Sequence, residues 1–242
     1  MLRPFFSYYG SKWRIGARYP APCGDTVIEP FAGSAGYSLH WHWKQVVLYD
    51  SDSMICGLWD YLIRVPESEI MSLPLVGPGE HLDGFPGLCP EARTLIGFWL
   101  QRGGSRPGSM RSPWSDPLGR EFPNQWWGEG VRSRIASQLG SIRHWKIGHS
   151  SYADVPDHVG TWFVDPPYAG AAGSRYRHGS SGIDYGDLGL WCRARRDLVV
   201  VCEGPAADWL PFEEFCFTSG SRKKSSELVW INGKRAEQLS LF

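Results

Sequence analysis

An acid, two prolines and an aromatic residue directly follow a buried-strand pattern in the stretch TWFVDPPYAG, residues 161–170. Thr161 to Val164 are apolar or β-branched and predict a strand that ends at Asp165. Asp and Pro together are also typical of an ordinary turn, so a turn with no chemistry is the alternative. The prolines would hold the Asp165 carboxylate and the Tyr168 ring on a stiff segment of backbone, which suits a binding or catalytic site.

A second candidate site is the glycine-containing loop EPFAGSAG, residues 29–36. It follows the strand pattern TVIE (26–29), and the stretch 34–43 predicts a helix capped by Ser34. Backbone N–H groups at such a turn can bind a carboxylate or phosphate. Asp50 ends the next strand pattern, where it could accept hydrogen bonds from a ribose diol. The loop is not GxGxxG, so the prediction is an adenosine-type cofactor other than NAD; a loop that serves packing alone remains open.

These residues need a sheet to bring them together. Strand patterns at 26–29, 46–50, 161–164, 198–201 and 228–231 alternate with helical stretches and predict an α/β fold with a parallel sheet. The pattern stops near residue 60 and resumes near 146. The residues between are rich in Pro and Gly, apart from the helical spacing of Val131, Ile135, Leu139 and Ile142. We expect a loop-rich insertion in the sheet.

Charge is unevenly distributed in a chain whose net charge is zero. Residues 92–150 carry nine basic residues and three acidic ones, whereas acids gather in 46–91. This segregation favours a basic face for a phosphate-rich partner, although an ordinary solvated surface would look similar. Six scattered cysteines without a CxxC pair indicate reduced thiols and no metal site. Neither a membrane span nor a signal peptide is predicted, so we expect a cytoplasmic protein.

Taken in order, these motifs resemble those of the Dam-like adenine-specific DNA methyltransferases. The chain has YYGSK (8–12), EPFAGSAG (29–36), YDSD (49–52) and VDPPY (164–168), and it closes with SSELVWING (225–233). The resemblance implies a Rossmann-like S-adenosylmethionine (AdoMet)-dependent methyltransferase sheet formed by residues 1–60 and 146–242. It also implies a small, loop-rich and helical target-recognition domain at residues 61–145.

The resemblance assigns the site residues as well. The implied AdoMet-binding residues are Tyr8, Lys12, Glu29, Phe31, Ala32, Gly33, Ser34, Ala35, Gly36, Asp50 and Asp165. The implied catalytic residues are Asp165, Pro166, Pro167 and Tyr168. Asp165 and the Pro166 carbonyl would accept hydrogen bonds from adenine N6, and Tyr168 would stack on the base once it has been extruded from the duplex.

The partner implied is double-stranded DNA, bound by a monomer or weak dimer in a prokaryotic or phage-infected cell, for example in a restriction–modification setting. Candidate DNA-binding residues are Arg111, Arg120, Arg132 and Arg134 in the insertion and Arg175 and Arg177 after the DPPY motif. We expect the small-residue loop 169–182 to become ordered on DNA. An RNA or protein N-methyltransferase, an inactive DNA-binding protein and a cytosine-N4 enzyme remain alternatives.

Some positions depart from the family pattern. Ser7 stands where a lysine often contacts the base, and HSSYAD (149–154) has serines where an acid often contacts the cofactor adenine. VCEG (201–204) replaces the usual Ser-Asn strand end, and the sequence gives no role for Glu203. The insertion matches the family's recognition hairpin poorly, so no target sequence is inherited.

Overall fold

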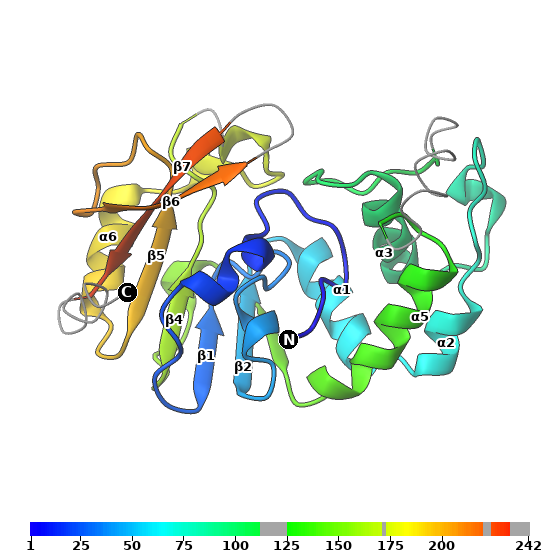
Figure 1. The fold of residues 1–242 in the computed structure, drawn as a ribbon, viewed down its shortest axis with the longest axis horizontal. Helices are drawn as coiled ribbons and strands as arrows, with labels where there is room; N and C mark the ends of the chain where they lie inside the picture. The colour runs from blue at the N-terminus through cyan, green and yellow to red at the C-terminus, as the bar shows by residue number, and fades with distance from the viewer. Residues whose placement is uncertain (112–124, 171–172, 220–223, 233–242) are drawn as a thin grey trace.

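The computed structural model describes residues 1–111, 125–170, 173–219 and 224–232. In this part of the chain one sheet of seven strands runs through the molecule (Figure 1). The strands are β1 (Thr26–Glu29), β2 (Gln45–Asp50), β3 (Lys146–His149), β4 (Thr161–Val164), β5 (Val199–Glu203), β6 (Glu213–Ser219) and β7 (Lys224–Ile231).

The strand order is β3-β2-β1-β4-β5-β7-β6. Strands β1 to β5 are parallel, and β7 pairs antiparallel with both β5 and β6. The prediction of an α/β fold with a mostly parallel sheet is confirmed. The sequence reading did not identify β3 as a strand, although it placed the return of the sheet at residue 146, and it missed β6.

Apolar side chains cover both faces of the central strands. Along β5, Val199 and Val201 pack into one core cluster, while Val200 and Cys202 pack into the other. This alternation is the two-residue period of a strand buried on both faces. It explains why β4 and β5 read as continuous apolar runs in the sequence.

Five α-helices are described. They are α1 (Ser53–Arg64), α2 (Glu67–Ser72), α3 (Pro90–Leu100), α5 (Glu129–Gln138) and α6 (Tyr185–Ala194). Short 3-10 helices are η1 (Lys12–Arg14), η2 (Gly16–Arg18), η3 (Ser38–His40), η4 (Leu82–Gly84), η5 (Leu139–Ile142), η6 (Tyr152–Asp154), η7 (Gly173–Arg175) and η8 (Ser180–Gly182). Within the described ranges, no helix combines the length and the apolar character needed to cross a bilayer.

The helix predicted for residues 34–43 is wrong. Only η3 forms there, and the Ser34 hydroxyl donates to Ser11 Oγ at 2.8 Å instead of capping a helix. Gly33 (φ +43°) and Ala35 (φ +50°) adopt left-handed backbone, which a right-handed helix cannot accommodate. Helical packing at 129–142 is confirmed, because the four apolar residues predicted to share a face are all buried.

The segment 61–145 is part of the long crossover from β2 to β3, which begins at residue 51, and α1 runs across its predicted start at residue 61. Trp99, Trp127 and Ile135 of this segment belong to the same core cluster as Val27 and Leu48 of the sheet. In the described part of the segment we therefore find no core separate from that of the sheet. Figure 1 shows α2, α3 and α5 gathered at one end of the molecule, on the β2 side, while α6 lies at the other end.

Candidate functional site

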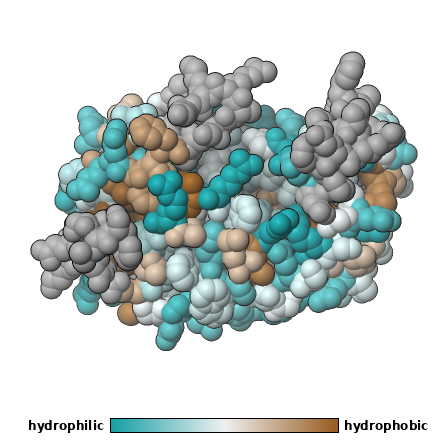
Figure 2. Space-filling view, viewed as in Figure 1, coloured by the Kyte–Doolittle hydropathy of each residue, from teal (hydrophilic) through white to brown (hydrophobic). Residues whose placement is uncertain are grey.

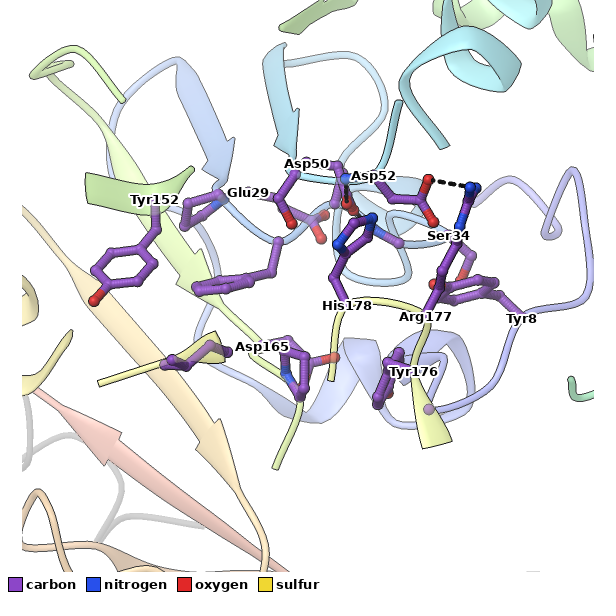
Figure 3. A pocket seen from close by; sticks show the side chains of 18 of the residues that line it. Tyr8, Glu29, Ser34, Asp50, Asp52, Tyr152, Asp165, Tyr176, Arg177 and His178 are labelled. Atoms are coloured by element: carbon purple, nitrogen blue, oxygen red, sulfur yellow. Dashed lines mark hydrogen bonds and ion pairs between the residues drawn. The ribbon is translucent and has the colours of Figure 1, made fainter. Parts of the chain in front are cut away.

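A cavity of about 460 Å³ opens at the carboxyl ends of β1, β2 and β4 (Figure 3). From β1 the chain continues outward to β2 and β3 on one side of the sheet, whereas from β4 it continues to β5 on the other side. The direction in which strands are added therefore reverses between β1 and β4. In open α/β sheets, ligands bind in the crevice at such a switch point. The volume of this cavity lies in the range of known small-molecule binding sites.

The glycine loop after β1 is folded against the end of β2. Gly33 N donates to Asp50 Oδ2 at 3.0 Å, and Asp52 N donates to Asp50 Oδ1 at 2.9 Å. Each carboxylate oxygen keeps a lone pair for a further donor. Burial raises the pKa of Asp50 to about 6, against the effect of these two N–H donors. Asp50 therefore lines the cavity as a fixed hydrogen-bond acceptor.

The N-terminal segment forms one wall of the cavity by packing directly on this loop. A Cβ on Gly36 would lie 2.6 Å from Trp13 N and 2.8 Å from Lys12 N, so only glycine allows this approach. A Cβ on Gly33 would lie 3.3 Å from the Tyr8 ring. The Tyr8 ring itself lines the cavity, and burial raises the pKa of its phenol.

Glu29, the last residue of β1, places a carboxyl group at the cavity with only 2 % of its surface exposed. Ser38 N donates to Glu29 Oε1 at 2.8 Å. Burial raises the pKa of Glu29 to about 8, although the Ser38 hydrogen bonds oppose the shift. Glu29 is thus largely protonated near neutral pH unless a cation comes next to it.

The other AdoMet-binding candidates of the loop are divided between the cavity and the core. Phe31, Ala32, Ser34 and Gly36 line the cavity together with Gly33, whereas Ala35 belongs to the hydrophobic core. Beyond β3, Ser150, Ser151 and Tyr152 also line the cavity, and the Tyr152 ring stacks on Phe31 at 5.6 Å.

Lys12 and Asp165 lie together in the lining of the cavity. Lys12 Nζ lies 2.7 Å from Asp165 Oδ1 and donates to Gly10 O at 3.1 Å. Burial lowers the pKa of Lys12, but the neighbouring carboxylates outweigh this and raise it above its ordinary value. The pKa of Asp165 is raised to about 6 by burial, against the effect of Lys12. The two side chains form an ion pair on the cavity wall.

The residues after Asp165 take different positions. Pro167 lines the cavity with Asp165, Pro166 is buried, and the Tyr168 phenol donates to Glu227 instead of pointing into the cavity. Lys12 Nζ lies 4.7 Å from the centroid of the Tyr168 ring. The DPPY residues thus lie next to one another, but Tyr168 contacts Glu227 and Lys12 and does not line the cavity.

Two buried acids beside this corner were not among the predicted site residues. Glu227 of β7 accepts from Tyr168 and, at 3.0 Å, from the Tyr19 hydroxyl. Glu203, at the end of β5, accepts from Ala169 N at 2.8 Å and Gly204 N at 2.6 Å, so it fixes the turn that follows Tyr168. Both stand next to apolar strand residues in the sequence. An acid within an apolar strand is buried only if it has hydrogen-bond partners. An acid at such a position in the sequence is therefore the signal that could have identified Glu203 and Glu227 as site residues.

Three of the predicted DNA-binding arginines bond to backbone carbonyls of the fold. Arg111 donates to Val76 O at 3.0 Å, Arg132 to Leu73 O at 2.6 Å, and Arg134 to Pro4 O at 2.9 Å. Arg134 also lies 5.1 Å from the Trp99 ring. These contacts give the three side chains a structural role. Arg120 lies outside the described residues.

Arg175 and Arg177 belong to a loop that covers the cavity. Arg175 lies 5.7 Å from the Tyr9 ring, and Arg177 pairs with Asp52 at 3.3 Å. Tyr176 and His178 also line the cavity, and the Tyr176 ring lies 6.1 Å from the Tyr8 ring (Figure 3). The loop therefore connects the DPPY corner with the acids at the end of β2.

On the face shown in Figure 2, hydrophilic residues gather across the middle of the molecule.

Neither a scan against protein-family models nor a search of curated proteins gave a match to this chain. Among the residues that the structure describes, no group of three or more His, Cys, Asp or Glu side chains could hold a metal ion.

Proposed function

We propose that this protein is an AdoMet-dependent DNA methyltransferase that modifies N6 of adenine in double-stranded DNA. The observation that carries the proposal is the composition of one cavity. Its walls hold the YYGSK segment, the EPFAGSAG loop, Asp50 and Asp165, which are far apart in the sequence. Four ordered motifs that meet at the switch point of an α/β sheet favour a shared site over chance similarity.

The residues that line the cavity support AdoMet as the cofactor. Glu29 is a buried carboxyl group suited to the ammonium group of the cofactor's methionine end, and Asp50 can accept from the ribose hydroxyls. The aromatic ring of Tyr8 offers a face to the adenine of the cofactor. Gly33 leaves room beside Tyr8 that a Cβ would fill.

When bound, AdoMet would supply an activated methyl group on its sulfonium, so the protein's task is to position the acceptor. Adenine N6 is a weak nucleophile because its lone pair is delocalised into the ring. Asp165, with the Pro166 carbonyl, would accept hydrogen bonds from the two N6–H groups and so orient that lone pair. The pKa of about 6 leaves Asp165 mostly ionised at neutral pH, ready to accept.

Access to N6 requires that the base leave the duplex. Tyr168 would then offer its ring to the extruded base, and the loop that carries Arg175 and Arg177 would close over it. We assign target recognition to the 61–145 segment, because it contacts the loop that covers the cavity: the Ser105 hydroxyl donates to Arg175 O. Gly103 N and Gly104 O of this segment bond to Ser7 Oγ and Tyr9 N at 2.9 and 3.1 Å.

The test is to incubate the protein with AdoMet and unmethylated plasmid DNA, digest the DNA to nucleosides and analyse them by mass spectrometry. We expect N6-methyladenine. Asp165→Ala should lower the rate by at least ~10²-fold, as is typical of removing one preorganised polar group. Asp25→Ala, at a side chain that is 98 % exposed, should not. N4-methylcytosine, methylation of RNA or protein alone, or no methylated product would overturn the proposal.

A further inference from the structure

The Lys12 ammonium group lies where the proposed reaction places the target amino group. It donates to Asp165 Oδ1 at 2.7 Å and lies 4.7 Å from the centroid of the Tyr168 ring. An adenine that stacks on Tyr168 and donates an N6–H hydrogen bond to Asp165 has to compete with Lys12 for both contacts. Lys12 therefore has to move, at least in part, when the base enters.

Moving Lys12 is costly unless another anion is close, because only 7 % of its side chain is exposed. An uncompensated buried charge is strongly unfavourable. The Glu227 carboxylate meets this need, since its Oε1 lies 3.6 Å from Lys12 Nζ, only slightly beyond direct contact. The ammonium group can reach it with a small shift.

Glu227 itself is firmly held. Only 6 % of its side chain is exposed, and its Oε1 accepts from the hydroxyls of Tyr19 and Tyr168. Because one of these donors is the tyrosine of the DPPY motif, Glu227 also fixes the ring on which the base would stack. The carboxylate thus connects the base platform with the lysine that has to leave it.

We infer that Glu227 is a positioning residue for the proposed reaction. It holds the phenol of Tyr168 and receives Lys12 when the target amino group displaces the ammonium group from Asp165. The inference rests on the proposed function, but it concerns a residue on β7, outside the residues that line the cavity.

The experiment is a double-mutant cycle that measures kcat and KM for DNA methylation with Glu227→Gln, Lys12→Met and the double variant. If Glu227 acts through Lys12, Glu227→Gln should lower kcat/KM at least ~10-fold in the presence of Lys12 and cause no further loss in Lys12→Met. A matched control is Glu214→Gln, at an exposed glutamate on the neighbouring strand β6, which should leave the rate unchanged.

Circular dichroism and thermal unfolding establish that each variant is folded. Should Glu227→Gln not fold, Glu227→Asp takes its place, since it keeps the charge and shortens the reach. Its loss should be smaller and should also disappear without Lys12. An active wild-type protein in which the Glu227 variant loses equally with and without Lys12 would overturn the transfer of Lys12 to Glu227, while the proposed function would stand. A folded wild-type protein that makes no methylated base would overturn the proposed function, and the positioning role with it.

Discussion

Replacement of Glu29 by glutamine should stabilise the free protein, and the gain should grow with pH. Glu29 is 2 % exposed, and burial raises its pKa from 4.5 to about 8. The folded state therefore binds the Glu29 proton more tightly than the unfolded chain does. The contribution of Glu29 to the free energy of unfolding is fully present below about pH 4.5 and is lost progressively as the pH rises to about 8.

The size of the effect follows from these pKa values. At about pH 7 the unfolded chain has released the proton and the folded protein has mostly kept it, and each pH unit above 4.5 costs about 1.4 kcal/mol. The loss relative to acidic pH is therefore about 3 kcal/mol. Glutamine can still accept from Ser38 N but has no proton to lose. The free energy of unfolding of Glu29→Gln should therefore equal that of the wild type at about pH 4 and exceed it by up to about 3 kcal/mol at about pH 7.

Urea unfolding of both proteins across this pH range measures the difference directly. Glu67→Gln, at an exposed glutamate of α2, is the control and should show no comparable trend. The same Glu29 variant should bind AdoMet at least ~10-fold more weakly by calorimetry, because the ammonium group of the cofactor loses a charged acceptor. A stability difference that is constant with pH, or a less stable variant at neutral pH, would refute the reasoning.

Three further results are expected. Asp50→Ala should weaken AdoMet binding by about 1.5–3 kcal/mol in calorimetry, since the ribose diol would lose a charged acceptor; unchanged affinity would remove Asp50 from the site. The kcat/KM for methylation should rise as the pH passes about 6, where Asp165 becomes ionised, and a flat profile between about pH 5 and pH 8 would contradict its role as acceptor. Gly36→Ala should lower the thermal stability measured by calorimetry, because its Cβ would press on the backbone of Lys12 and Trp13. In Gly24→Ala the Cβ would meet no atom within 4 Å, but φ is +72°, so this variant reports the cost of backbone strain alone.

The sequence alone was sufficient to predict most strands of the parallel sheet and the three acids, Glu29, Asp50 and Asp165, that line the cavity at their ends. Strands β1, β2 and β4 were readable because buried strands are continuous apolar runs, and each of these three ends in an acid or is followed by one. Since parallel strands place their carboxyl ends at one edge, the topology requires Glu29, Asp50 and Asp165 to lie close together. In the structure all three line the same cavity.

Only the tertiary structure decided which partner each polar group takes. The charge of Arg132 and Arg134 predicts DNA binding, and the sequence does not reveal that long-range packing also gives them backbone carbonyl partners 59 and 130 positions away. The ion pair of Lys12 and Asp165 joins residues 153 positions apart in the chain, and Glu227 reaches both Tyr19 and Tyr168 from the antiparallel strand β7. Local propensity carries no information about such pairings, because they depend on how the strands are ordered in the sheet.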